Sequence, residues 1–301
     1  MKVLKTLQSE SKLSQYTHID HLVLRVNNLH KQIEFYQTAL KMKLYDSNSK
    51  EATLGSEDKV LLKLIHNQTY VKRNQETSLY HFALLYPNEE SLAFALKHLD
   101  ALRIPHSPTD HGYSKTTYLE DLEGNVIELY IRTVDRAVYI EDKGEIYVQY
   151  RDGHYGSGRD PLNLEALYQH TLNKQSFSIL PALTQVGHLH FYAKDLTESS
   201  QFYEELLGYG KGIDYASFRM KDVALSEAQN HVLAFNTWKG SSVTLHKEDS
   251  LGLESYTLNV TNQDYEAINQ RLIEANYPYL QKDENLIVHD PSNMKIYIKA
   301  K

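Results

Sequence analysis

The chain contains no cysteine, and this absence removes several kinds of chemistry at once. Without thiols it cannot form disulfides, zinc–thiolate sites or a cysteine nucleophile. A block of basic residues is also missing, and the formal net charge is −7. A nucleic-acid backbone or an anionic membrane is therefore not expected as its main partner.

Long apolar runs are absent as well. No run approaches the roughly 18 apolar residues of a membrane span, and the opening sequence MKVLKTLQSESKLSQ lacks the apolar core of a signal peptide. Together with the lack of cysteine, these features predict a cytoplasmic protein. The 301 residues, of which 41% are hydrophobic, are enough for one large domain or two of ordinary size.

What the sequence does contain is an internal repeat. Segment 19–42 matches segment 186–209 at a constant offset of 167 residues and without a gap, so that His21 aligns with His188 and a Phe-Tyr pair recurs. Each copy has the alternation of a strand, followed by apolar residues at helical spacing. A gapless match of this length indicates duplication of one structural unit.

Two later segments show the same strand–helix–strands pattern. Their last strands, VIELYIR and NMKIYIK, align at the same offset, which places Glu128 opposite Lys295. We therefore predict an α+β fold of four modules, at about residues 17–66, 78–132, 185–247 and 254–300. The first two modules would form one domain at 16–133 and the last two another at 185–301. The polar segment 134–184 is either a linker or an excursion that covers a domain.

Segment 110–130, DHGYSKTTYLEDLEGNVIELY, places His111, Tyr118 and Glu128 on two predicted strands joined by an acidic, glycine-centred turn. The neighbours of the glutamate are apolar, namely Val126, Ile127 and Leu129. A carboxylate on an apolar strand is costly unless a partner neutralises it. A metal ion is the usual partner where histidines are also at hand.

With this segment and the repeat, the chain resembles the vicinal oxygen chelate superfamily, which includes glyoxalase I, bleomycin-resistance proteins and extradiol dioxygenases. Members are built from paired βαβββ modules whose curled mixed sheets enclose a metal or ligand cavity. The segment resembles the extradiol signature, whose positions are held here by His111, Tyr118, Asp121, Gly124 and Glu128. Thr117 and Leu122 depart from it, where an apolar residue and a proline are usual. Within the superfamily the chain looks closest to catechol-2,3-dioxygenase-like proteins.

The resemblance implies a metal site of two histidines and one carboxylate. Such a set binds iron(II) or manganese(II) and leaves three adjacent positions for a catecholate and dioxygen. Glu128 would be the carboxylate, and His81 in YHFALL would be one histidine. The other should open the first strand of the partner module, and both His21 and His188 fit that description.

A further histidine bears on that choice. Extradiol enzymes carry a catalytic histidine on a later strand of the module that supplies the first ligand. His231, 43 residues after His188, fits this position, whereas Lys59 stands there in the first module. We therefore predict that modules two and three pair across the domains and that His188 is the third ligand. Pairing of modules one and two would use His21 instead.

With these residues, the resemblance implies a metal-dependent extradiol dioxygenase that acts on a catechol- or hydroquinone-type aromatic and inserts O2 next to the diol. By the resemblance, His231 would act as the base, and His111 and Tyr118 would hydrogen-bond the substrate oxygens. One alternative is a glyoxalase-like metal isomerase or thiol transferase, and another is a binding protein that holds a small molecule without metal. The exact substrate, the choice between iron and manganese, and homo-oligomerisation are left open.

Overall fold

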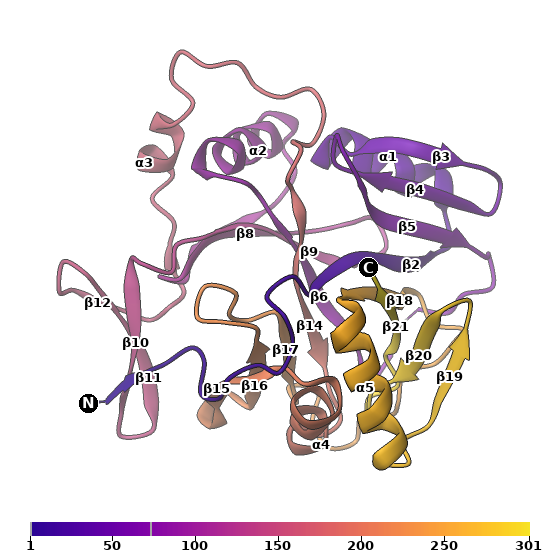
Figure 1. The fold of residues 1–301 in the computed structure, drawn as a ribbon. Coiled ribbons are helices and arrows are strands. Elements are labelled where there is room, and N and C mark those ends of the chain that lie inside the picture. Colours follow the sequence, from indigo (N-terminus) through magenta and orange to yellow (C-terminus); the bar gives the residue numbers. More distant parts are fainter. Residues whose placement is uncertain (1, 73) are drawn as a thin grey trace. The chain divides into compact units, whose positions relative to one another are not determined.

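The computed structural model describes residues 2–72 and 74–301 (Figure 1). The chain divides into two compact units. The first contains the residues up to Leu4 together with Val26–Gln68 and His81–Val186, and the second contains Lys5–Arg25, Thr69–Tyr80 and Gly187–Lys301. Within the described ranges, none of the helices has the length and apolar character needed to cross a membrane.

Each of the four repeats contains a strand, a helix and three further strands in that order, which confirms the predicted α+β architecture. The elements of module one are β2 (His18–Val26), α1 (Leu29–Leu40), β3 (Lys43–Ser47), β4 (Glu51–Gly55) and β5 (Val60–His66). Those of module two are β6 (Ser78–Leu85), α2 (Glu89–Leu102), β7 (Ser107–Asp110), β8 (Ser114–Glu120) and β9 (Val126–Arg132).

The second pair of modules follows the same order. The elements of module three are β14 (Gln185–Tyr192), α4 (Leu196–Gln201), the π-helical turn η1 (Phe202–Leu207), β15 (Gly210–Tyr215), the 3₁₀ turn η2 (Ala216–Phe218), β16 (Met220–Ala224) and β17 (Leu233–Asn236). Those of module four are β18 (Gly252–Val260), α5 (Asn262–Glu274), β19 (Tyr279–Lys282), β20 (Asn285–His289) and β21 (Lys295–Ala300). In Figure 1, α5 lies along the strands of its own module, where it contacts β21.

The segment between modules two and three is structured and belongs to the first unit. Its elements are β10 (Ala137–Asp142), β11 (Glu145–Tyr150), β12 (Tyr155–Gly156), β13 (Asp160–Pro161) and α3 (Leu164–Gln169). Strand β1 (Lys2–Leu4) pairs with β10, and β10 pairs with β11. Strand β13 pairs with β7, which brings Asp160 opposite Asp110.

In three modules the register shows that the first and last strands are parallel neighbours, namely β6 with β9, β14 with β17, and β18 with β21. This pairing places the middle of the first strand beside the middle of the last one. Module four also meets module one, because β18 pairs antiparallel with β2. A side chain on one of these paired strands therefore has close neighbours from distant parts of the sequence.

The tyrosine of the duplicated Phe-Tyr pair links the helix of one module to a turn of the next. The tyrosines of the two helices, Tyr36 and Tyr203, are fully buried. Their hydroxyls donate to the carboxylates of Asp121 and Asp290 at 2.8 Å in both repeats. Each aspartate also accepts backbone N–H groups of its own turn, so one carboxylate anchors the turn and the helix together.

Burial of Asp290 predicts a pH-dependent stability. Desolvation raises the pKa of this carboxyl from 3.8 to about 6, although Tyr203 and two backbone N–H groups donate to it. The folded chain therefore holds this proton more tightly than the unfolded chain does. The stabilisation is complete below about pH 4 and is lost as the pH rises to about 6, by about 3 kcal/mol at 1.4 kcal/mol per pH unit.

Urea unfolding of the wild type and of Asp290→Asn between pH 4 and pH 7 measures this contribution. Asparagine does not titrate, so the free energy of unfolding of the variant should gain about 3 kcal/mol relative to the wild type across that range. Asp283→Asn, at an exposed position of the same module, is the control. Parallel profiles for wild type and Asp290→Asn would contradict the prediction.

Candidate metal centre

The strand register brings Glu128 and His81 together. Glu128 lies in the middle of β9, opposite Ala83 of β6 and Tyr118 of β8. His81 precedes Ala83 by two residues and so projects from the same face of β6. Its Nε2 lies 3.1 Å from Oε2 of Glu128, and both side chains are buried. The carboxylate on the apolar strand thus faces a histidine, a partner of the kind that its burial requires.

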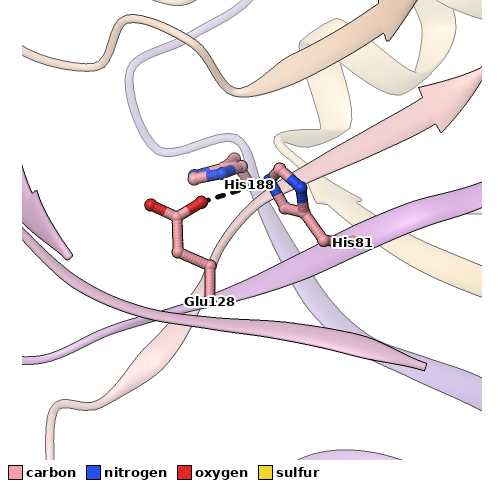
Figure 2. A group of neighbouring side chains, drawn as sticks. All are labelled: His81, Glu128 and His188. Atoms are coloured by element: carbon pink, nitrogen blue, oxygen red, sulfur yellow. Dashed lines mark ion pairs between the residues drawn. The ribbon is translucent and has the colours of Figure 1, made fainter. Parts of the chain in front are cut away.

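His188, in β14, is buried to a similar degree. One ligand atom each of His81, Glu128 and His188 lies within 4.8 Å of the other two (Figure 2). Among the described residues this is the single group of three or more histidine or acidic side chains arranged in this way. Two imidazoles and one carboxylate form a nitrogen and oxygen donor set that suits iron(II) and manganese(II).

The histidine related to His188 by the repeat has a different environment. Nδ1 of His21 lies 2.7 Å from the carboxylate of Asp20, its neighbour in sequence. In β2 it stands opposite Thr257 of β18. Lys295, the counterpart of Glu128, forms an ion pair with Glu254 at 2.6 Å. His21 thus has Asp20 and Thr257 as neighbours, and the group that could hold a metal contains His188 instead.

His111 and Tyr118 form a hydrogen-bonded pair beside His81. Nε2 of His111 lies 2.9 Å from the hydroxyl of Tyr118, whose ring centroid is 5.6 Å from that of His81. Nδ1 of His111 lies 2.5 Å from the carbonyl oxygen of Gly158. Because a carbonyl only accepts, Nδ1 carries the proton, and Nε2 of the neutral ring accepts from Tyr118.

The position of His111 differs from the prediction that it lies on a strand. It lies in the turn between β7 and β8, and segment 134–184 holds that turn. Arg136 forms an ion pair with Asp110, the residue before His111. A Cβ on Gly112 would come within 2.4 Å of Val148, so the excursion packs directly on the turn. Segment 134–184, predicted as either a linker or a covering excursion, thus holds the backbone around His111 and binds its ring through the carbonyl of Gly158.

His231 also departs from its predicted place on a strand. It precedes β17 and has a left-handed backbone, with φ of 51°. Such a conformation costs a non-glycine residue on the order of 1–3 kcal/mol and is often kept at functional sites. Its ring lies 4.9 Å from that of His188, edge to face. Its Nδ1 lies 2.7 Å from the carboxylate of Asp222.

Asp222 is a residue that the sequence reasoning missed. It lies on β16, is 5% exposed, and is flanked by apolar residues on its C-terminal side. The criterion that singled out Glu128, a carboxylate on an apolar strand, would also have found it. Its contact partner His231 is far enough away in sequence that only the pairing of β16 with β17 brings the two together.

Aromatic residues line the same face of β14 beyond His188. His190 follows by two residues, and Nδ2 of Asn236 donates to its Nε2 at 2.9 Å. Tyr80 packs edge to face on His190 and on Trp238, with ring centroids 5.1 and 5.3 Å apart. The surroundings of His190, two residues beyond His188, are therefore aromatic and closely packed.

Comparison with known proteins agrees with this description. Residues 18–129 match the family model of the Glyoxalase/Bleomycin resistance protein/Dioxygenase superfamily. A catechol-2,3-dioxygenase of Bacillus subtilis (strain 168) is 28% identical over 279 residues, which cover 91% of this chain and 94% of the relative. Glyoxalase I of Zea mays superposes with a TM-score of 0.55, at 15% identity and with 94% of this chain and 92% of the other covered. The cppA protein of Streptococcus pneumoniae TIGR4 gives 0.53 at 13% identity, with 94% and 99% covered.

Four βαβββ modules and a buried His/His/Glu group define a protein of repeated modules with a candidate metal centre. Residues 18–129, which span most of the first two modules, match the glyoxalase, bleomycin-resistance and dioxygenase superfamily. This match confirms the resemblance that the sequence shows to that superfamily.

Proposed function

We propose that this chain is a metal-dependent extradiol dioxygenase that cleaves a catechol- or hydroquinone-type ring next to the diol. The observation that carries the proposal is the buried group of His81, Glu128 and His188, with ligand atoms within 4.8 Å of one another. The relative named catechol-2,3-dioxygenase, which matches over nearly the full length, supports the same chemistry. Pairing of modules two and three is part of the proposal, because it is the pairing that brings these residues to one metal.

The proposed metal is iron(II), with manganese(II) as the other ion that accepts these ligands. His81 and His188 would donate through imidazole nitrogen and Glu128 through a carboxylate oxygen. One negative charge from the protein offsets part of the charge of a divalent ion, and burial of the three side chains limits competition by water. When bound, the ion would act as a Lewis acid toward the diol oxygens and supply redox chemistry to dioxygen.

Each histidine of the ligand set has a proposed proton-handling group in ring contact with it. His231, in ring contact with His188, would accept a proton from the diol. Tyr118, in ring contact with His81, would hydrogen-bond a substrate oxygen and pass protons to or from His111. Because Nδ1 of His111 donates to the carbonyl of Gly158, its Nε2 faces Tyr118 with a lone pair and can receive the phenolic proton.

Metal analysis followed by oxygen uptake tests the proposed function. Protein loaded with iron(II) under anaerobic conditions is mixed with catechol in air, and a second sample receives hydroquinone. We expect one metal ion per chain, stoichiometric oxygen uptake with one of the two diols, and a yellow muconic-semialdehyde-type product. Metal binding without oxygen uptake across a panel of diols would instead support isomerase or transferase chemistry. Absence of bound metal would contradict the proposed function.

Substitution of the carboxylate ligand should abolish both metal binding and turnover. Glu128→Ala leaves two imidazoles in the group and removes its negative charge, which lowers the affinity for a divalent ion and leaves no complete facial set. Glu120→Ala, at the exposed end of the neighbouring strand β8, is the matched control and should keep wild-type metal content. Retained metal stoichiometry in Glu128→Ala would show that the ligand assignment is wrong.

A further inference from the structure

Strand β15 contains an irregularity that creates a place for one carboxylate. In the ladder with β16, Lys211 pairs with Val223 and Asp214 with Lys221, so β15 has one residue more than β16 between these pairs. This is the pattern of a β-bulge. Asp222 lies opposite the bulge, and its Oδ1 accepts the backbone N–H of Ile213 at 2.6 Å.

Gly212 makes room for that carboxylate. A Cβ at this position would lie 1.9 Å from Oδ1 of Asp222 and 2.8 Å from its backbone oxygen. No side chain fits at these distances unless Asp222 moves. The bulge, the glycine and the Ile213 N–H therefore act together to hold Asp222 in one orientation, with 5% of the residue exposed.

The second oxygen of Asp222 is directed to His231. Oδ2 lies 2.7 Å from Nδ1 of His231, and a carboxylate oxygen only accepts, so Nδ1 carries the proton. In the neutral ring Nε2 is then the nitrogen with the lone pair. The left-handed backbone of His231 is held as well, because Val232, the next residue, donates to the carbonyl of Val223 at 2.9 Å.

We infer that Asp222 is a positioning residue, which holds His231 in the Nδ1–H tautomer and so presents Nε2 to a molecule bound at His188. The inference rests on the proposed function for its last step only, since the tautomer and the bulge are properties of the protein by itself. The arrangement requires four parts, namely Gly212, Ile213, Asp222 and His231. None of them belongs to the group that could hold a metal.

The isosteric variant Asp222→Asn should change the tautomer of His231. The buried N–H of Ile213 still needs an acceptor, so the amide oxygen of the new side chain must face it. The amide NH2 then faces Nδ1 of His231 and can only donate. His231 must therefore change to the Nε2–H tautomer. Its lone pair is then on Nδ1, and Nε2 can no longer accept a proton.

The tautomer can be read without metal and without substrate. In metal-free protein at about pH 8.5, where an ordinary imidazole is neutral, the carbon and nitrogen NMR shifts of the His231 ring distinguish the two tautomers. We expect Nδ1–H in the wild type and Nε2–H in Asp222→Asn. Gly212→Ala should also lose the wild-type signature, because its Cβ displaces the carboxylate. Asp214→Asn, which removes an exposed ion pair with Lys221 in the same strands, should keep it.

Steady-state kinetics with the iron(II)-loaded proteins complete the test. In Asp222→Asn we expect kcat to fall by about 10²-fold or more, while metal content and KM stay near the wild-type values, because the ligands are untouched. An Nε2–H tautomer in the wild type would overturn the inference even if no variant folds. An unchanged tautomer in Asp222→Asn would also overturn it. A changed tautomer in a protein that never consumes oxygen would support the positioning role and remove the proposed dioxygenase activity instead.

Discussion

Replacing His188 by alanine should remove metal binding and catechol cleavage, and replacing His21 by alanine should leave both intact. The two histidines occupy the same place in two copies of one repeat, so each is the natural control for the other. His188 lies in the group with His81 and Glu128, whereas His21 is hydrogen-bonded to Asp20. Loss of one of three ligands leaves the ion with too few protein donors for the facial set.

The measurement is metal stoichiometry after dialysis, together with the rate of oxygen uptake. Circular dichroism and the urea midpoint show whether both variants keep the wild-type fold. Metal lost from His21→Ala and kept by His188→Ala would reverse the ligand assignment and favour pairing of modules one and two. Metal kept by both variants would show that neither repeat-related histidine is a ligand.

Substitution of His231 by asparagine should reduce kcat by about 10²–10⁴-fold, the usual range for loss of a general base. Asparagine is suited to this position because it accepts the left-handed backbone that His231 adopts. The ligand group is unchanged, so the variant should bind metal at the wild-type stoichiometry. An anaerobic titration with catechol should still detect substrate binding, because the diol meets the same ion.

Arg219→Asn is the matched control for the backbone. Arg219 has the same left-handed φ of 51° in the same unit, and its side chain is exposed. Its substitution should leave kcat unchanged. A His231→Asn variant with wild-type kcat would exclude His231 as the base. A variant that instead loses both its metal and its activity would show a role in binding the ion rather than in proton transfer.

Local sequence is sufficient for most of the fold and for part of the site. The repeat predicts four modules, and all four have the order strand, helix and three strands. Asp195 precedes an apolar residue as a helix-start signal does, and its carboxylate accepts from the N–H groups of Thr197 and Glu198 at the start of α4. Such features depend on residues within one or two turns of each other, so their physical causes are visible in the sequence.

Turn residues are harder to place. His111 and His231 are both candidate site residues. The sequence predicts a strand at each of them, yet both lie outside the strands. For His231 the reason is a positive φ, which alternating hydrophobicity does not reveal. For His111 the reason is the excursion 134–184, whose Arg136 and Gly158 hold the turn. Polar composition alone does not show that such a segment packs on a site.

The sequence by itself determined the module, its number of copies and the carboxylate that needs a partner. Only the tertiary structure places His188, and not His21, in a group with His81 and Glu128, and places Asp222 beside His231. The physical reason is that the two copies of the repeat are locally equivalent. Both can form the same strand, and the surroundings of each histidine depend on strand register and burial set by contacts far apart in the chain.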